Sequence, residues 1–410
     1  MDMEISNKPA LTMHVDLNSC FAIIEQQANP LIRHKPVVIA AYDTPRGMII
    51  ASSYEAKALG LALGLSVAQA REVYPGVIVM MPDPEKYFDA NRRFHKVLSR
   101  YTDNVVAKSV DEFAVDFEGS PAIRNGLSME EIGLKIKEDV KRELGKYVTI
   151  NVGIAPNRFL AKLAAGLNKP DGMNRIDHTN LREVLSKVSL IDLPGINTRY
   201  QARLNLNGIY TPLQFLDADL DKLKKQVFGS IVGYYWYLRL RGYPIDQIDF
   251  SRKTIGQQYA LGNKTKDISE LSRLIMKLSE KVGRRLRRAN LTAGGIYLTV
   301  GFEGYRFFGH RRKLKERIYA TQQIHREAMK VLNMVQINSR VTNISVTVYD
   351  LKDLRFKQIS LFNSSEADLY AIAEASDEVN DRYGEFTLTP ARMANMQDII
   401  LKRVAFGKID

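Results

Sequence analysis

The sequence is poor in cysteine and lacks long apolar runs. Its 410 residues include one cysteine, Cys20, which excludes an intramolecular disulfide and a cysteine-rich zinc site. No apolar run approaches the ~20 residues that a membrane-spanning helix needs. The first ten residues, MDMEISNKPA, are polar and mixed in charge, unlike a signal peptide. These absences fit a reducing compartment, and we expect a cytoplasmic protein.

The charge is strongly basic and concentrated in one part of the chain. Lys and Arg exceed Asp and Glu by 13 over the whole chain. Residues 251–350 hold 20 Lys and Arg against 7 Asp and Glu, which equals the whole excess. A polyanionic partner is therefore expected, nucleic acid first and an anionic membrane surface second. The alternative is a solvated basic face without a partner.

Residues 1–175 have the pattern of strands and helices around one sheet. Two strands are expected to meet near Asp111 and Glu112, from the apolar stretches NVVAKSV and FAVDF. Ser128 and Glu131 have the spacing of an N-terminal capping box. Further strands are expected at 11–18, 35–42, 47–53 and 148–155, and helices at 54–72, 85–100, 128–144 and 157–168.

The remainder of the chain divides into three parts. Residues 178–245 lose the strand signal, and LPGI at 193–196 followed by NGI predicts a helix-hairpin-helix, which either contacts a DNA phosphate or only joins two helices. Residues 246–252 are a connector. The order β-α-β-β-α-β over 253–356 predicts a split βαβ domain. We expect a weakly structured tail over 357–410.

Three carboxylates follow or interrupt apolar strands: Asp16, Asp111 and Glu112. Adjacent carboxylates repel, and their burial is costly unless a cation compensates. Carboxylates without a His or Cys cluster suit Mg²⁺, and two Mg²⁺ ions can stabilise both oxygens of an in-line phosphoryl displacement. The alternative is that Asp16 caps a strand and that Asp111 and Glu112 form a polar turn.

Four motifs occur in order around these carboxylates. They are HVDLNSCFAIIEQ (14–26), SSYEAKALGL (52–61), SVDEF (109–113) and GIAPNRFLAKLAAGLNKPDG (153–172). Together they closely resemble the motifs of Y-family translesion DNA polymerases of the bacterial UmuC/DinB type. The resemblance extends to LPGI in the thumb, to RKTIGQ (252–257) and to QISLF (358–362), which is similar to a sliding-clamp-binding peptide.

The resemblance implies a role for individual residues. Asp16, Asp111 and Glu112 match the metal-binding carboxylates, and the carbonyl of Leu17 matches a further ligand. The other implied roles are the steric gate for Phe21, triphosphate contacts for Tyr54, Lys57 and Lys169, and clamp binding for Gln358, Leu361 and Phe362.

The sequence also departs from the family's pattern at several positions. Lys57 stands where Arg is frequent, so a point charge replaces a bidentate clamp. Ser19 and Cys20 stand where aromatic residues are common. Met48 and Ile50 fall where members with roomy active sites have small residues, and both are alternatively core residues of the fingers.

The resemblance implies an α+β, right-hand, multidomain polymerase. It places a ferredoxin-like palm at 1–25 and 83–175, fingers at 26–82, a helical thumb at 176–245, a linker at 246–252 and a DNA-binding little finger at 253–356, before the tail. The implied function is low-fidelity translesion synthesis without proofreading, with two Mg²⁺ ions. The implied partners are primer-template DNA, deoxynucleoside triphosphates and the sliding β clamp, and the implied state is a monomer.

Two alternatives belong to other functional classes. One is a catalytically inactive polymerase paralogue that acts as a DNA-binding adaptor, against which the intact Asp16, Asp111 and Glu112 argue. The other is a nucleotide cyclase, which shares the palm and paired carboxylates but needs neither a thumb nor a basic C-terminal module.

Overall fold

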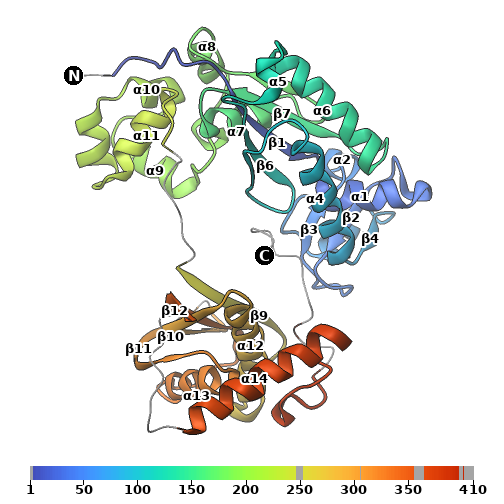
Figure 1. Cartoon of the computed structure of the whole chain (residues 1–410), viewed down its shortest axis with the longest axis vertical. Helices are drawn as coiled ribbons and strands as arrows, with labels where there is room; N and C mark the ends of the chain where they lie inside the picture. Colours follow the sequence, from blue (N-terminus) through green and yellow to red (C-terminus); the bar gives the residue numbers. More distant parts are fainter. Residues whose placement is uncertain (1–2, 246–252, 305, 355–363, 397–399, 401–410) are drawn as a thin grey trace. The chain divides into compact units, whose positions relative to one another are not determined.

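The computed structural model describes residues 3–245, 253–304, 306–354, 364–396 and 400. The described residues form two compact units, one over 3–245 and the other over 253–400 (Figure 1). In the described residues no helix is both long enough and apolar enough to cross a bilayer.

The first unit is built on a five-stranded sheet in the order β5-β6-β1-β7-β8. Its central strand, β1, is antiparallel to both neighbours, while β8 is parallel to β7. The strands are β1 (Thr12–Leu17), β5 (Val105–Ala107), β6 (Glu112–Asp116), β7 (Ile150–Ala155) and β8 (Met173–Arg175).

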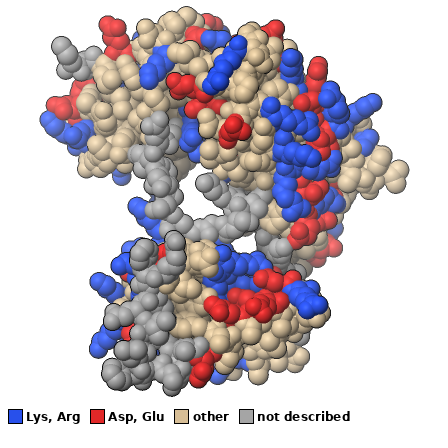
Figure 2. All heavy atoms as spheres, viewed as in Figure 1, with Lys and Arg blue, Asp and Glu red and all other residues tan. Residues whose placement is uncertain are grey.

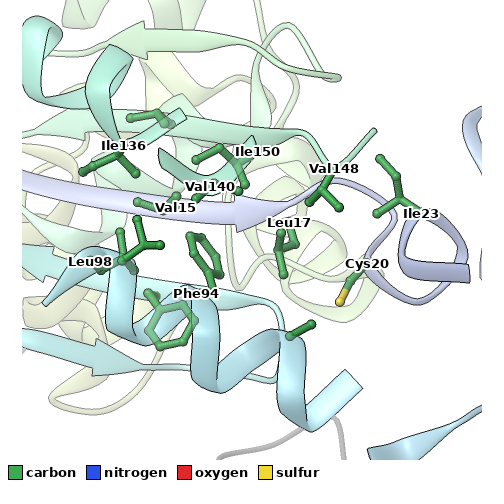
Figure 3. Close-up of a cluster of buried hydrophobic side chains, with 14 of the residues drawn as sticks. Val15, Leu17, Cys20, Ile23, Phe94, Leu98, Ile136, Val140, Val148 and Ile150 are labelled. Carbon is green, nitrogen blue, oxygen red and sulfur yellow. The ribbon is translucent and has the colours of Figure 1, made fainter. Parts of the chain in front are cut away.

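Alternate residues of β1 point to opposite faces of the sheet. The side chains of Met13, Val15 and Leu17 enter the apolar core. Figure 3 shows Val15 and Leu17 with Phe94, Leu98, Ile136 and Val140. These partners come from the helices that cover this face, α4 (Pro84–Leu98) and α6 (Met129–Leu144), and α1 (Cys20–Ala28) follows β1.

The helix α7 (Arg158–Gly166) packs closely against the sheet through a glycine of β7. A Cβ on Gly153 would lie 2.0 Å from the carbonyl oxygen of Ala161, so only glycine permits this approach. The predicted capping box of α6 is confirmed, because Ser128 and Glu131 exchange side-chain-to-backbone hydrogen bonds. The short helix α5 (Pro121–Arg124) precedes α6.

Residues 30–80 form a small sheet in the order β3-β2-β4. The single helix expected over 54–72 is wrong, because the chain forms two helices separated by Gly60 and Gly64, whose φ angles are +80° and +94°. The elements are η1 (Pro30–Ile32), β2 (Val37–Ala40), β3 (Ile49–Ser52), α2 (Tyr54–Ala58), α3 (Val67–Val73) and β4 (Ile78–Met80).

Residues 181–240 are helical around an aromatic core of Phe215, Phe228 and Trp236. The predicted helix, glycine turn and helix are present, since Gly195 and Gly208 take positive φ on either side of α9. The elements are α8 (Leu181–Ser186), η2 (Leu190–Asp192), α9 (Thr198–Leu206), α10 (Pro212–Asp217), the π-helix η3 (Lys222–Val227) and α11 (Val232–Leu240).

The second unit contains the predicted β-α-β-β-α-β order. Its sheet has the order β11-β10-β12-β9 with antiparallel neighbours, so each helix joins two parallel strands that are separated by a third strand, as predicted. The elements are β9 (Thr254–Thr265), α12 (Ile268–Arg288), β10 (Leu291–Phe302), β11 (Phe307–Ile318), α13 (Thr321–Leu332) and β12 (Val341–Asp353).

The prediction of a weakly structured tail is wrong for the part of the tail that the structure describes. Residues after 363 form α14 (Ser364–Tyr383) and the turn η5 (Ala391–Met393). Asp377 of α14 accepts two hydrogen bonds from Arg287 of α12, at 2.5 and 2.9 Å. Asp381 accepts one hydrogen bond each from Arg284 and Arg288, so part of the basic excess of α12 is neutralised within the unit. Figure 2 shows acidic and basic side chains side by side on this unit.

Candidate active site

Strand pairing brings the three predicted carboxylates together. Asp16 on β1 lies directly opposite Glu112 on β6 in the antiparallel register. Asp111 precedes β6, and its carbonyl oxygen accepts a 2.9 Å hydrogen bond from the backbone N–H of Leu17. Residues almost one hundred positions apart therefore meet at one end of two adjacent strands.

Each carboxylate has a compensating partner in the chain. Lys169 Nζ lies 2.6 Å from Asp16 Oδ1. Lys162 Nζ donates to both oxygens of Glu112, at 2.8 and 2.6 Å. Ser109 Oγ donates to Asp111 Oδ1 at 2.5 Å. Of these partners, Lys162 was missed from the sequence, where a helical lysine looks like a surface charge.

The electrostatic balance differs among the three carboxylates. Burial raises the pKa of Asp16, although Lys169 opposes the rise, and the charges of Asp111 and Glu112 add to it. Burial likewise raises the pKa of Asp111, against the hydrogen bond from Ser109. Burial also acts to raise the pKa of Glu112, but Lys162 outweighs it and the pKa lies below its ordinary value. The ionised forms of Asp16 and Asp111 are thus less stable than those of exposed carboxylates, whereas that of Glu112 is more stable.

A histidine that the sequence reasoning did not single out belongs to the same cluster. His14 shares the face of β1 with Asp16, and burial lowers its pKa to about 4. Among the described residues, ligand atoms of His14, Asp16 and Glu112 lie within 4.8 Å of one another. The two-residue spacing of His14 and Asp16 on a strand is the sequence signal that could have found it.

A cavity of about 280 Å³ collects most of the predicted nucleotide-site residues. Its walls also include Ile50, whereas Met48 is 56% exposed and does not line it. The predicted residues among its lining are Asp16, Leu17, Phe21, Lys57, Asp111 and Lys169.

The aromatic and lysine residues of this cavity are held by specific contacts. Phe21 is buried and stacks on Tyr87, with ring centroids 4.4 Å apart. Lys57 Nζ donates a 2.7 Å hydrogen bond to Ser19 Oγ and lies 4.6 Å from the ring centroid of Tyr54. Burial lowers the pKa of Lys57, and the nearby charge of Lys169 lowers it further. Ser19, at a position where aromatic residues are common in the family, therefore orients Lys57 through this hydrogen bond. Cys20 is buried in the core.

A second cavity of about 530 Å³ opens on the α7 side of the same carboxylates. It is lined by Asp16 and Glu112, and extends past α7 to Val188 and Pro194. The carboxylates therefore stand between two cavities of the first unit. This arrangement allows one substrate group to approach them from each side.

The donor set fits divalent cations that prefer oxygen ligands. Asp16, Asp111 and Glu112 offer carboxylate oxygens, which are the preferred ligands of Mg²⁺. The raised pKa values of Asp16 and Asp111 show that additional positive charge would stabilise their ionised forms. Gln358, Leu361 and Phe362 lie outside the described residues.

Two family models match the chain. One, described as "impB/mucB/samB family", matches residues 15–166, and the other, described as "impB/mucB/samB family C-terminal domain", matches residues 252–361. The first range contains the three carboxylates with Lys57 and Lys162, and it ends just before Lys169. The second contains the β-α-β-β-α-β domain.

Relatives match over almost their full length. DNA polymerase IV of Staphylococcus haemolyticus is 28% identical over 359 residues, covering 86% of this chain and 98% of the relative. DNA polymerase IV 1 of Bacillus subtilis is 27% identical over 409 residues, covering 98% of this chain and 97% of the relative.

Solved structures share the fold. A Y-family DNA polymerase chimera of Dbh and Dpo4 superposes with a TM-score of 0.70 at 24% identity, covering 83% of this chain and 99% of that one. An insertion ternary complex of Dbh DNA polymerase superposes with a TM-score of 0.57 at 23% identity over the same shares. These likenesses establish the predicted right-hand, multidomain α+β fold.

Proposed function

Because the chain belongs to the Y family of DNA polymerases, through the two impB/mucB/samB models that match it, we propose that it carries out translesion DNA synthesis. It extends a primer on damaged template with deoxynucleoside triphosphates. The observation that carries this proposal is the meeting of Asp16, Asp111 and Glu112 at the ends of two paired strands, where Asp16 and Asp111 line a cavity that also holds Phe21 and Lys169. A catalytically inactive adaptor would have no need of these intact carboxylates.

The carboxylates are the groups that would hold two Mg²⁺ ions. Asp16, Leu17 and Asp111 line the smaller cavity, and Asp16 and Glu112 line the larger one. When bound, the ions supply Lewis-acid stabilisation of the attacking and leaving oxygens in phosphoryl transfer. Asp16 lines both cavities and would therefore contribute to holding both ions.

The lysines of the site supply positive charge that can bind a triphosphate. Lys57 and Lys169 line the same cavity as the carboxylates, and both carry mobile ammonium groups. Lys169 exchanges Asp16 for a phosphate oxygen when the substrate arrives, because a phosphate offers more negative charge than a single carboxylate. Tyr54, beneath Lys57, adds a phenolic hydroxyl at the start of α2.

Phe21 is suited to exclude ribonucleotides. Its ring is fixed by stacking on Tyr87 and forms part of the cavity wall, so it cannot rotate away freely. A ribose 2′-hydroxyl placed against this ring meets carbon atoms and loses its hydrogen bonds. Discrimination then arises from exclusion of the wrong sugar.

The second unit is suited to bind the DNA backbone with the open face of its sheet, which is the face that α12 and α13 do not cover. Arg311 on β11 lies over the ring of Tyr297 on β10, and both line a shallow cavity with Lys253 and Tyr349. Basic groups interleaved with aromatic rings suit phosphate and sugar contacts. The glycine turns around α9 in the first unit are suited to a further phosphate contact.

The finer properties follow from the family resemblance and remain predictions. They are low fidelity, the lack of proofreading, a monomeric state, a cytoplasmic location and recruitment by the sliding β clamp through Gln358, Leu361 and Phe362. A glutamine followed by two large apolar side chains in a polar setting suits a short peptide that docks in a partner's pocket.

Primer extension tests the proposed function. The purified chain is incubated with a labelled primer annealed to an undamaged template or to one with an abasic site, in the presence of the four deoxynucleoside triphosphates and Mg²⁺. We expect extension of both templates and loss of extension with a chelator. DNA binding without extension on either template would support the inactive adaptor instead.

A further inference from the structure

The candidate active site contains a nitrogen ligand that the proposed Mg²⁺ chemistry does not use. His14 and Asp16 stand two residues apart on β1, so their side chains share one face of the sheet. Glu112 lies opposite Asp16 on β6, and His14 Nε2 is 3.9 Å from Glu112 Oε2. One imidazole and two carboxylates thus surround a common point.

The imidazole is both buried and without a hydrogen-bond partner at this nitrogen. His14 is 3% exposed, and its Nε2 atom is a buried polar atom that no described group satisfies. Leaving such a polar atom unpaired in the interior is unfavourable, so an ion bound at this nitrogen would remove an energetic cost. The residue lines the cavity of about 530 Å³ together with Asp16 and Glu112, so a small ion can reach the nitrogen.

The donor set selects among metal ions. Imidazole nitrogen suits Zn²⁺ best, and a mixed set of one nitrogen and two carboxylates also accommodates Mn²⁺, whereas Mg²⁺ is held by oxygen ligands. A tetrahedral Zn²⁺ site needs donor atoms about 3.3 Å apart, given metal–ligand distances of about 2.0 Å. The donor atoms of the three side chains are already within 4.8 Å of one another.

We propose that His14, Asp16 and Glu112 form a site for a divalent transition-metal ion, Mn²⁺ or Zn²⁺, with His14 Nε2 as a direct ligand. The site shares two carboxylates with the proposed Mg²⁺ positions, so the two kinds of ion compete. It does not depend on the polymerase reaction, because it is defined by binding to the protein alone.

Two lysine ammonium groups already contact the carboxylates, so they would compete with the metal ion for these oxygen ligands. Lys162 Nζ contacts Glu112 and Lys169 Nζ contacts Asp16, with side-chain exposures of 44% and 34%. Both ammonium groups are carried on flexible four-carbon stems, so they can withdraw into solvent when a dication arrives. The buried imidazole of His14 cannot withdraw in this way, so it remains in place as the third ligand.

Pulsed electron paramagnetic resonance of Mn²⁺ bound to the full chain tests the proposal without measuring polymerase activity. We expect ¹⁴N modulation from a directly bound imidazole, which changes to the ¹⁵N pattern when the protein is labelled with [¹⁵N]histidine. The modulation should vanish in His14→Phe and persist in His178→Phe, a matched change at an exposed histidine of the same unit. The labelling experiment uses the unaltered protein, so it stands even if His14→Phe does not fold.

Calorimetric titration with Zn²⁺ and Mg²⁺ separates this site from the proposed Mg²⁺ positions. His14→Phe should weaken Zn²⁺ binding by about tenfold or more, since loss of even an outer-shell partner commonly costs that much, and should leave Mg²⁺ affinity unchanged. Absence of histidine modulation in the unaltered protein, or equal Zn²⁺ affinity in His14→Phe, would overturn the proposal. Neither result would affect the proposed polymerase function, and failed primer extension would not affect the metal site.

Discussion

The ion pair between Arg287 and Asp377 should hold α14 on the second unit. The Arg287 side chain is 4% exposed and that of Asp377 is 14% exposed, and two hydrogen bonds of 2.5 and 2.9 Å join them. Asp377→Asn keeps the shape of the side chain but removes its charge, leaving the guanidinium buried without its main partner.

The magnitude follows from the burial and from the contacts that remain. Breaking a buried ion pair by removing one partner costs about 3–5 kcal/mol. Arg287 keeps Glu280 at 3.9 Å and a 3.2 Å hydrogen bond to Thr321, so compensation is partial. The lower end of the range therefore applies, and we expect about 3 kcal/mol.

Arg182 and Asp217 in the first unit provide a matched control. They are also joined by two hydrogen bonds, at 2.7 and 3.0 Å, but their side chains are 56% and 53% exposed. Asp217→Asn should cost at most about 1 kcal/mol, because solvent screens an exposed pair.

Native-state hydrogen exchange of α12 and α14 measures the local opening free energy in Asp377→Asn, and exchange of α8 and α10 measures it in Asp217→Asn. A large loss for the first variant and a small one for the second are expected. Equal, small losses in the two variants would refute the reasoning that burial gives the α14 contact its strength.

Three further predictions concern substrate, DNA and partner. Phe21→Ala should raise ribonucleotide insertion relative to deoxynucleotide insertion, measured as the ratio of kcat/KM values; an unchanged ratio would place the sugar gate elsewhere. Replacing Arg311 and Lys313 on the open sheet face with Gln should reduce the slope of log affinity for primer-template against log salt by about 0.9 per lost phosphate contact. The same change at Arg326, on α13, should leave the slope unaltered, and equal slopes in all three proteins would remove the sheet face from the DNA interface. Replacing Gln358, Leu361 and Phe362 with Ala should preserve clamp-free extension and abolish stimulation by loaded β clamp, whereas wild-type clamp affinity of that variant in a titration would show that the peptide has another role.

Local pattern was sufficient to predict most regular elements. Alternating or continuous apolar residues predicted β1 and β7, and Ser128 with Glu131 predicted the start of α6, because these signals depend on neighbours in sequence. The helix over 54–72 failed at Gly60 and Gly64, whose positive φ angles end α2 before the start of α3. The apolar spacing of three and four does not by itself reveal this break.

The helix in the tail and the lysine partners of the carboxylates could not be predicted from local sequence pattern, because they depend on contacts between distant parts of the chain. Helix α14 has a weak apolar face, and its acidic residues find Arg284 and Arg287 some ninety positions away in sequence. Lys162 likewise meets Glu112 only when α7 packs on β7 through Gly153. The carboxylates themselves were predicted from their positions at strand ends and from the family's motifs, and β1–β6 pairing brings Asp16 and Glu112 opposite each other.

Single-turnover nucleotide incorporation by Asp111→Asn, measured beside its affinity for primer-template DNA, tests the central claim most directly. The substitution keeps the size of the side chain and its position near Ser109, and removes the negative charge proposed to hold Mg²⁺. The account predicts incorporation slower by about 10²-fold or more, in line with the loss of a principal electrostatic contribution to catalysis, together with DNA affinity close to that of the unaltered protein. Incorporation at the unaltered rate with normal DNA binding would contradict the assignment of these carboxylates as the catalytic metal site.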